Sequence, residues 1–396
     1  MNKLPLVAAL AAASICTVAG AQSVQLYGKL YPYVEQESGS GQTAAGTSTA
    51  TLAPATITGA RLVNKIKGMS AGNSNLGFRG TEDLGGGMKA KFQLEGVVGV
   101  DTGAGFSFNR NTFVGLVGNF GEVRLGNMDT VFKEYGDTIG ILGISSGTPV
   151  SSSNILRKVA FGTSNNARFH ERRANSIRYD SPEFSGIQFG AQVATQEAPI
   201  TGGNESAKTY SFGIKYDQGP IYVALATEVH KGWYGGSSNS RSSQSNLGTG
   251  VGAKDTATQL TVEYRLTKDH KFEFDVINKQ YKEGGFAVGR FQSYKNTAYL
   301  FGYDGRFGPV RFMAHYVKAQ AGSCALVATA CSTSGLAGSQ ITAGASYSLS
   351  RRTNIFAAYS KITNGSAGRF SALDLNPGVA QGEDTTHMLA GVSHNF

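Results

Sequence analysis

Apolar and polar side chains alternate with a period of two residues along most of this chain, in segments of about ten residues. Residues 75–96 give the clearest example. One parity there holds Leu76, Phe78, Met88, Ala90, Phe92 and Leu94, and the other holds Asn75, Arg79, Lys89, Lys91, Gln93 and Glu95. Successive side chains of a β-strand point to opposite faces. Each segment therefore predicts a strand with one apolar and one polar face.

The connections between these segments alternate between short and long. About sixteen segments occur, and the short turns between them are EDLGGG, NFG, SPEFS, QG, TKD, GRFG and SRR. The eight long, Gly- and Ser-rich connections are 38–73, 99–109, 129–173, 197–207, 231–255, 283–292, 321–338 and 364–383. This order places all short turns on one rim and all long loops on the other, as in barrels with periplasmic turns and extracellular loops.

A soluble secreted β-protein is the alternative fold. It would explain short strands, but not the strict alternation of connection length, and long unstructured loops are uncommon in compact soluble domains. Hydrophobic residues make up 40% of the chain, below the roughly 45–50% of a typical soluble domain. A sheet in lipid must close on itself to pair its backbone groups. We therefore predict an all-β transmembrane antiparallel barrel of about sixteen strands, formed by residues 22–396 as a single domain.

The first 21 residues, MNKLPLVAALAAASICTVAGA, have a lysine near the start, an apolar run and a small-residue end. This pattern predicts a cleaved secretory signal peptide. Lipidation at Cys16 is disfavoured because Ile15 stands where a small residue is needed. The remaining cysteines are Cys324 and Cys331. In an oxidising compartment this pair predicts a small disulfide loop, with free thiols or half of a metal site as the alternatives.

The formal net charge is +9, from 36 basic and 27 acidic residues. A basic balance fits nucleic acid, an anionic membrane surface or anionic solutes, and export argues against nucleic acid. On the polar parity, the early segments place Lys29, Arg79, Lys89, Lys91, Arg110, Arg124 and Arg178 against Glu95 and Glu122. Later segments are mixed, with Lys215, Arg265, Lys271 and Arg311 against Glu228, Glu263, Glu273 and Asp275. The basic excess therefore falls on one predicted wall, although any single charge can instead pair with a neighbour.

The longest connection, 129–173, lies between the basic strands. It begins with Asp129, Glu134 and Asp137 and ends with a basic run. A loop of this length can fold into a barrel and narrow it. Acidic loop residues facing a cationic wall would set up a field across the narrowest point. We therefore predict that these three carboxylates and the seven basic residues of the early strands line the pore and its constriction.

Four runs resemble the neisserial-type general porins of β-proteobacteria. They are SNLGFRGTEDLGGGMKAKFQLEG, RNTFVGLVGNFGEVRLGN, ANSIRYDSPEFSG and the terminal GVSHNF. The resemblance covers the mature chain in order. It implies a homotrimer of sixteen-stranded barrels in outer-membrane lipid and lipopolysaccharide, each with its third loop folded inward, in a family often selective for anions. Arg110 and Arg178 match positions where relatives carry pore arginines, whereas Asn75 stands where relatives often have a basic residue.

Catalytic chemistry has little support in the sequence. Residues 143–147 read G-x-S-x-G, but within the longest loop and without the strand-to-helix elbow that activates such a serine. The six histidines show no paired metal-binding spacing. We therefore predict no enzyme activity, no cofactor and no metal, and passive diffusion of small, preferably anionic solutes. A channel specific for phosphate or dicarboxylates is the alternative, followed by a barrel adhesin or enzyme.

Overall fold

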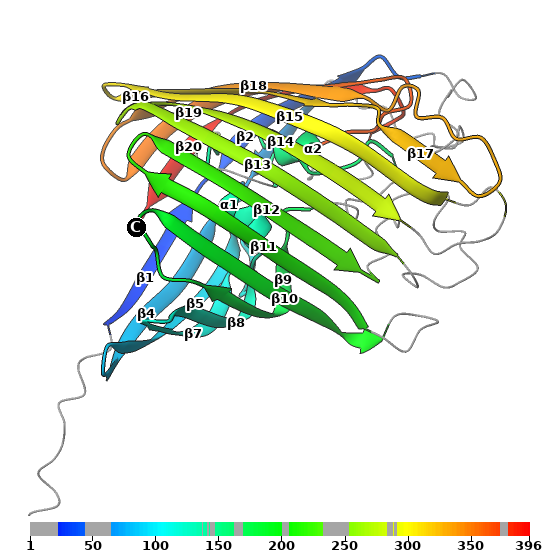
Figure 1. The fold of residues 1–396 in the computed structure, drawn as a ribbon. Helices are drawn as coiled ribbons and strands as arrows, with labels where there is room; N and C mark the ends of the chain where they lie inside the picture. Colours follow the sequence, from blue (N-terminus) through cyan, green and yellow to red (C-terminus); the bar gives the residue numbers. More distant parts are fainter. Residues whose placement is uncertain are drawn as a thin grey trace, which may run out of the picture.

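The computed structural model describes residues 23–43, 65–136, 138–140, 142, 147–161, 169–199, 206–232, 253–282, 288, 291–372 and 379–396. Nearly all of its secondary structure is one antiparallel sheet that closes on itself (Figure 1). The predicted signal peptide and the cleavage site before Gln22 lie outside the described residues.

The strands are β1 (Ser23–Leu30), β2 (Tyr33–Ser40), β3 (Lys65–Ser70), β4 (Asn75–Gly85), β5 (Met88–Gly99), β6 (Ala104–Ser107), β7 (Thr112–Gly118), β8 (Gly121–Asp129), β9 (Arg172–Asp180), β10 (Ile187–Pro199), β11 (Ser206–Gln218), β12 (Ile221–Lys231), β13 (Lys254–Thr267), β14 (His270–Lys282), β15 (Phe291–Phe307), β16 (Val310–Ala319), β17 (Ser323–Leu326), β18 (Gly338–Ser348), β19 (Thr353–Asn364) and β20 (Asp384–Asn395). Two short helices, α1 (Val131–Tyr135) and α2 (Ser153–Leu156), follow β8.

These elements form a wall of sixteen strands, which confirms the predicted fold class and strand number. β1 and β2 are the two halves of one wall strand, and β3 and β4 are the halves of the next, because β1 pairs with β4 while β2 pairs with β3. The first strand breaks at Pro32, which has no amide proton to donate to a neighbour. β6 and β17 are short strands within the long connections, each paired with one end of a wall strand.

The barrel closes between its first and last strands. Lys29 lies opposite Asn395 in the pairing of β1 with β20. The backbone of Phe396 exchanges two hydrogen bonds with that of Gly28, at 3.2 and 3.1 Å. A sheet within lipid has no water to satisfy an open edge. Closure therefore lets this sheet cross a membrane. No helix in the described part of the chain is long and apolar enough to cross one.

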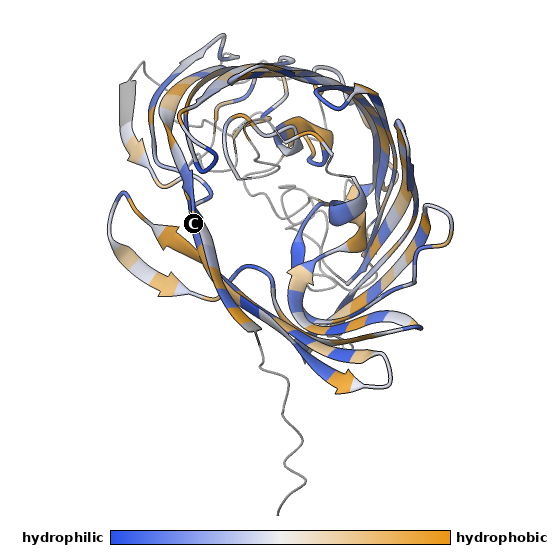
Figure 2. Cartoon of the chain, turned by 90° about the vertical axis from the view of Figure 1, so that its left-hand side faces the viewer, coloured by the Kyte–Doolittle hydropathy of each residue, from blue (hydrophilic) through white to orange (hydrophobic). Residues whose placement is uncertain are grey.

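Hydrophilic and hydrophobic residues alternate along strands of the wall (Figure 2), and the exposure of the side chains assigns the apolar parity to the outer face. Outward positions carry apolar side chains that are about half exposed, such as Val114 and Leu116 on β7, Leu225 on β12 and Phe301 on β15. In the β4–β5 hairpin, Phe78 lies opposite Leu94 and Arg79 lies opposite Gln93. Since directly paired residues share a face, the apolar parity points to lipid and the basic parity to the lumen.

Short and long connections alternate around the barrel as predicted. The wall strands are joined by tight turns at one rim, where the C-terminus also lies (Figure 1). Three of the predicted long connections contain short strands, since β3, β6 and β17 fall within 38–73, 99–109 and 321–338. The β3 pairing shifts register beside Gly68, whose φ of +94° suits glycine.

Gly28 provides a test of closure by packing. A Cβ at this position would lie 2.5 Å from the Phe396 ring and 2.7 Å from the Asn75 carbonyl oxygen. We expect Gly28→Ala to destabilise the folded barrel by about 1–3 kcal/mol, the usual cost of overpacking. The temperature at which the folded form converts to the unfolded form in a detergent gel should fall.

Gly105→Ala is the matched control, because nothing lies within 4 Å of a Cβ at Gly105. Equal stability of the Gly28→Ala and Gly105→Ala proteins would contradict the role given to the contact between Gly28 and Phe396.

Candidate pore constriction

The connection between β8 and β9, the third long loop, folds into the barrel, and both of its helices lie inside the ring of strands (Figure 2). Thr130 caps α1 by accepting a hydrogen bond from the Lys133 amide at 3.3 Å. Val131, Phe132 and Tyr135 of α1 are almost fully buried. The apolar side of this helix therefore packs against the inner wall, as the inward-folding prediction requires.

Two glycines in the wall make room for α1. Gly190 of β10 and Gly213 of β11 are paired across the two strands. A Cβ at Gly190 would lie 2.8 Å from Val131 Cγ1, and one at Gly213 would lie 2.7 Å from Tyr135 Cδ2. Any larger residue would push the helix toward the middle of the lumen. Burial beside Asp180 raises the pKa of the Tyr135 hydroxyl, so this side chain stays neutral.

Basic side chains hold the second half of the described loop. Lys279 of β14 is 0% exposed, and its Nζ donates to the carbonyl oxygens of Leu156 and Lys158, both at 2.8 Å. Arg157 donates to Gln259 Oε1 at 3.0 Å. Ile155 and Leu156 of α2 are fully buried among apolar residues of the lumen wall. This half of the lumen therefore resembles the core of a soluble protein.

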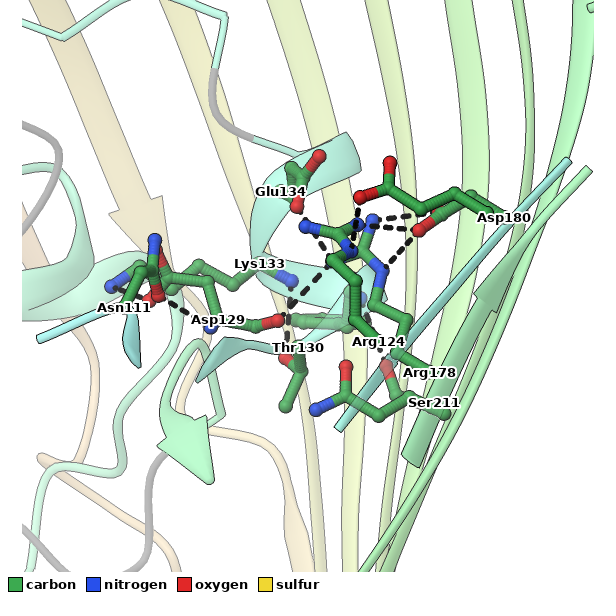
Figure 3. Close-up of polar contacts among 12 residues, drawn as sticks. Asn111, Arg124, Asp129, Thr130, Lys133, Glu134, Arg178, Asp180 and Ser211 are labelled. Carbon is green, nitrogen blue, oxygen red and sulfur yellow. Dashed lines mark hydrogen bonds and ion pairs between the residues drawn. The ribbon is translucent and has the colours of Figure 1, made fainter. Parts of the chain in front are cut away.

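Two of the three predicted acidic residues of the third loop, Asp129 and Glu134, act as anchors (Figure 3). Asp129 lies 3.0 Å from Lys133 Nζ and 3.0 Å from Arg172 Nη2. Glu134 lies 2.6 Å from Arg178 Nη1. Asp137 lies outside the described residues. The described carboxylates thus fasten the loop to the wall, and their charges are matched by cations.

Arg178 is buried behind the loop. Its side chain is 0% exposed and pairs with Asp180 at 2.8 Å as well as with Glu134. Arg124 also contacts Asp180, at 2.5 Å, and lies across from Arg178 in the pairing of β8 with β9. Figure 3 shows both guanidinium groups gathered at this carboxylate. Arg178 therefore clamps the loop, and solutes in the lumen do not reach it.

Two more of the predicted basic residues have carboxylate partners. Arg110 forms an ion pair with Glu95. Lys91 pairs with Glu122 at 3.0 Å. The sequence count of seven cations against two carboxylates omitted Asp180 on the wall and left out Glu134 because it lies on the loop. Four of the seven predicted cations, Lys91, Arg110, Arg124 and Arg178, are therefore compensated.

The other three, Lys29, Arg79 and Lys89, form no ion pair with a carboxylate in the described ranges. Lys29 Nζ donates to the Leu142 carbonyl of the third loop at 3.4 Å and lies 4.4 Å from the Tyr31 ring centroid. Arg79 is exposed, donates to Gln25 Oε1 at 3.0 Å and stacks over Tyr27. Lys89 is exposed beside the β4–β5 turn. No carboxylate in the described ranges therefore balances these three side chains.

Later strands add a second basic region near the short-turn rim. A hollow of about 660 Å³ is lined there by Arg265, Lys268, His270, Lys271, Arg306 and Arg311, with Glu263, Asp269 and Asp304 among them. Glu263 pairs with Arg265 and Lys271, both at 2.7 Å, and Asp304 pairs with Arg311. Arg306 has no ion pair among the described residues. The available positive charge is therefore spread over several walls of the barrel, whereas the sequence count placed it on one.

Two further groups of side chains lie close enough together to bond or to share a ligand. Cys324 and Cys331 form a disulfide at β17, with Cα atoms 5.8 Å apart. Sequence spacing missed a second cluster, in which Glu35, Glu37 and His387 place potential ligand atoms within 4.8 Å of one another. His387 Nδ1 and Glu35 Oε1 are 2.6 Å apart. His387 is far from Glu35 and Glu37 in sequence and meets them only because β2 pairs with β20, so the register of the closed barrel was the missing signal.

A closed sixteen-stranded barrel with an inward-folded third loop and a charged lumen defines the porin class of outer-membrane proteins. The chain belongs to the Gram-negative porin family, whose model matches residues 7–367. It is similar to the outer membrane porin protein 32 of Delftia acidovorans, with 32% identity over 82% of this chain and 85% of that protein. This membership places the protein in the outer membrane.

Other relatives match in sequence or fold. The major outer membrane protein P.IB of Neisseria meningitidis serogroup B is 35% identical over 153 residues, which are 38% of this chain. The alignment spans 40% of the length of that relative. The anion-selective porin from Comamonas acidovorans superposes with a TM-score of 0.69 at 25% identity, over 95% of this chain and all of that chain. OmpT of Vibrio cholerae, at 13% identity and a TM-score of 0.59 over 95% of this chain and 98% of that one, shares the fold alone.

Lys279 tests the attachment of the third loop. In Lys279→Met, the carbonyl oxygens of Leu156 and Lys158 lose a buried donor, which costs about 1–3 kcal/mol. We expect the loop to detach more often, so single-channel current should become noisier while the barrel remains folded. Lys295→Met, at an exposed lysine of β15, is the control. Equal current noise in both variants would show that Lys279 does not hold the loop.

Proposed function

We propose that this protein forms a water-filled channel through which small hydrophilic solutes diffuse passively, with a preference for anions. The observation that carries this proposal is the imbalance of charge in the lumen. No carboxylate in the described ranges pairs with Lys29, Arg79, Lys89 or Arg306. By contrast, cations pair with both described acidic residues of the third loop, Asp129 and Glu134. A net positive lining raises the local concentration of anions. The fold similarity to an anion-selective porin supports the same preference.

The apolar outer face of the barrel fits outer-membrane lipid, with lipopolysaccharide in the outer leaflet. Family membership further supports a homotrimer as the assembled form. Chemical cross-linking of the purified protein in mild detergent should then give a species of three chains. A single-chain product at every cross-linker concentration would argue against the trimer.

A channel specific for one anion is the second candidate. It is favoured by the clustering of cations in the hollow of about 660 Å³ near the short-turn rim, where Arg306 and Arg311 lie beside Arg265 and Lys271. Catalysis has no such observation in its favour. Ser145 of the G-x-S-x-G run lies outside the described residues. We propose that the protein acts without covalent chemistry and without a cofactor.

Anion preference depends on cations that lack carboxylate partners. We expect Lys29→Gln combined with Arg79→Gln to shift the reversal potential in a potassium chloride gradient toward the value for a non-selective pore. Removing the Arg110–Glu95 pair as a whole, by Arg110→Gln and Glu95→Gln, leaves the net charge unchanged. We expect that variant to keep the selectivity of the wild type. Planar-bilayer recordings provide the measurement.

A cation-selective wild-type channel would refute the anion preference, and the absence of any conductance would refute the porin function. Equal shifts in the two double variants would show that the pairing of charges in the lumen does not decide selectivity.

A further inference from the structure

A second, smaller hollow of about 170 Å³ lies between the third loop and the short-turn rim. Its lining contains three cations and no carboxylate: Lys29, Arg306 and Arg311. The other polar lining residues are Ser346, Ser348, Asn354, Ser393 and Asn395, and the rest of the lining is Tyr31, Leu142, Met313 and Phe356. Each of these three cations can donate charged hydrogen bonds to a ligand in the hollow.

The three cations come from distant parts of the chain. Arg306 lies directly opposite Arg311 in the pairing of β15 with β16. Lys29 lies opposite Asn395, where β1 meets the last strand. Closure of the barrel therefore brings the first strand to the same hollow as two arginines almost three hundred residues later. No local sequence motif marks this site.

Neighbouring contacts hold the site in place. Arg311 Nε donates to Asp304 Oδ1 at 2.8 Å, which fixes the guanidinium group from the side of the larger hollow. Lys29 is held by the Leu142 carbonyl at 3.4 Å. On the far side, Ser348 donates to Asn354 at 2.8 Å. Arg306 has no ion pair among the described residues, so its fork of N–H groups is available to a ligand.

Charge and size together define the ligand class. Arg311 is paired with Asp304, so Lys29 and Arg306 bring to the hollow the positive charge that no carboxylate balances, and a bound anion would balance it. A planar guanidinium fork, an ammonium and serine hydroxyls can donate to an oxyanion from several directions. The hollow has room for about five or six water molecules at about 30 Å³ each. This volume suits a small ion.

We propose that Lys29, Arg306 and Arg311, with the serines of β18 and β20, bind a small tetrahedral oxyanion such as phosphate or sulfate. The proposal rests on the porin function above and deepens it by assigning a discrete binding site to the anion pathway. Arg306 and Arg311 also line the larger hollow at the rim. An ion that leaves this site toward the rim therefore stays in contact with the same two arginines.

The test measures block of chloride current through the purified full-length protein in planar bilayers. Inorganic phosphate or sulfate, added on the side of the short-turn rim, should reduce the current at concentrations far below that of chloride. In Lys29→Gln combined with Arg306→Gln, the half-blocking concentration should rise at least about tenfold, because two charge-assisted hydrogen bonds are lost. Ser346→Asp, which places a carboxylate in the hollow, should weaken the block in the same direction.

Lys215→Gln is the matched control. Lys215 is an inward lysine of β11 that lies 4.9 Å from the Tyr135 ring centroid and lines neither hollow. The Lys215→Gln variant loses one positive charge from the inner wall, as each of the two substitutions in the test variant does. It should nevertheless leave the half-blocking concentration of sulfate unchanged. Succinate, a dicarboxylate of the same charge as sulfate, should block only at higher concentrations.

The outcomes separate this site from the channel function. A protein without conductance would refute the channel itself. A conducting, anion-selective protein that phosphate and sulfate fail to block would refute only the site. An equal rise in half-blocking concentration in the Lys215→Gln control would assign the block to general electrostatics, and equal block by succinate would refute the preference for a tetrahedral ion.

Discussion

The pairing of backbone hydrogen bonds between the first and last strands is the constraint on which the rest of this structure depends. Within lipid, an open sheet edge would leave amide and carbonyl groups without partners. The contact of β1 with β20 and the two bonds between Gly28 and Phe396 remove that edge. Closure then fixes the register of every strand, and the register decides which side chains share the lumen.

Inside the closed wall, charged side chains fall into two groups with different tasks. Arg178, Arg172 and Lys133 are matched by carboxylates at the start of the third loop, and Lys279 is saturated by loop carbonyl groups. These residues position the loop. Lys29, Arg79, Lys89 and Arg306 are left to act on solutes. Basic side chains thus both build the constriction and set its electrostatics. Whether a side chain has a bonding partner in the protein decides which of the two roles it has.

The sequence predicted the strands well because the period of two is a local property of the chain. It predicted the inward loop from length and position, and the basic lumen from parity. It did not predict which cations are available, because Arg110 and Arg178 find their partners only through contacts between strands and with the loop. For the same reason it missed Arg306 and the cluster in which the register of β2 and β20 brings Glu35 and Glu37 to the distant His387.

The packing of α1 against Gly190 and Gly213 has a consequence for how this barrel can evolve. Where α1 lies against β10 to β12 and α2 lies against β15, β16 and β18, the interior is close-packed and the size of a side chain matters most. The rest of the lumen faces water and tolerates changes of size better, but exchanging a charged residue there alters the charge that solutes meet. Mutations in these two parts of one lumen should therefore be subject to different selection pressures, one for volume and one for permeability.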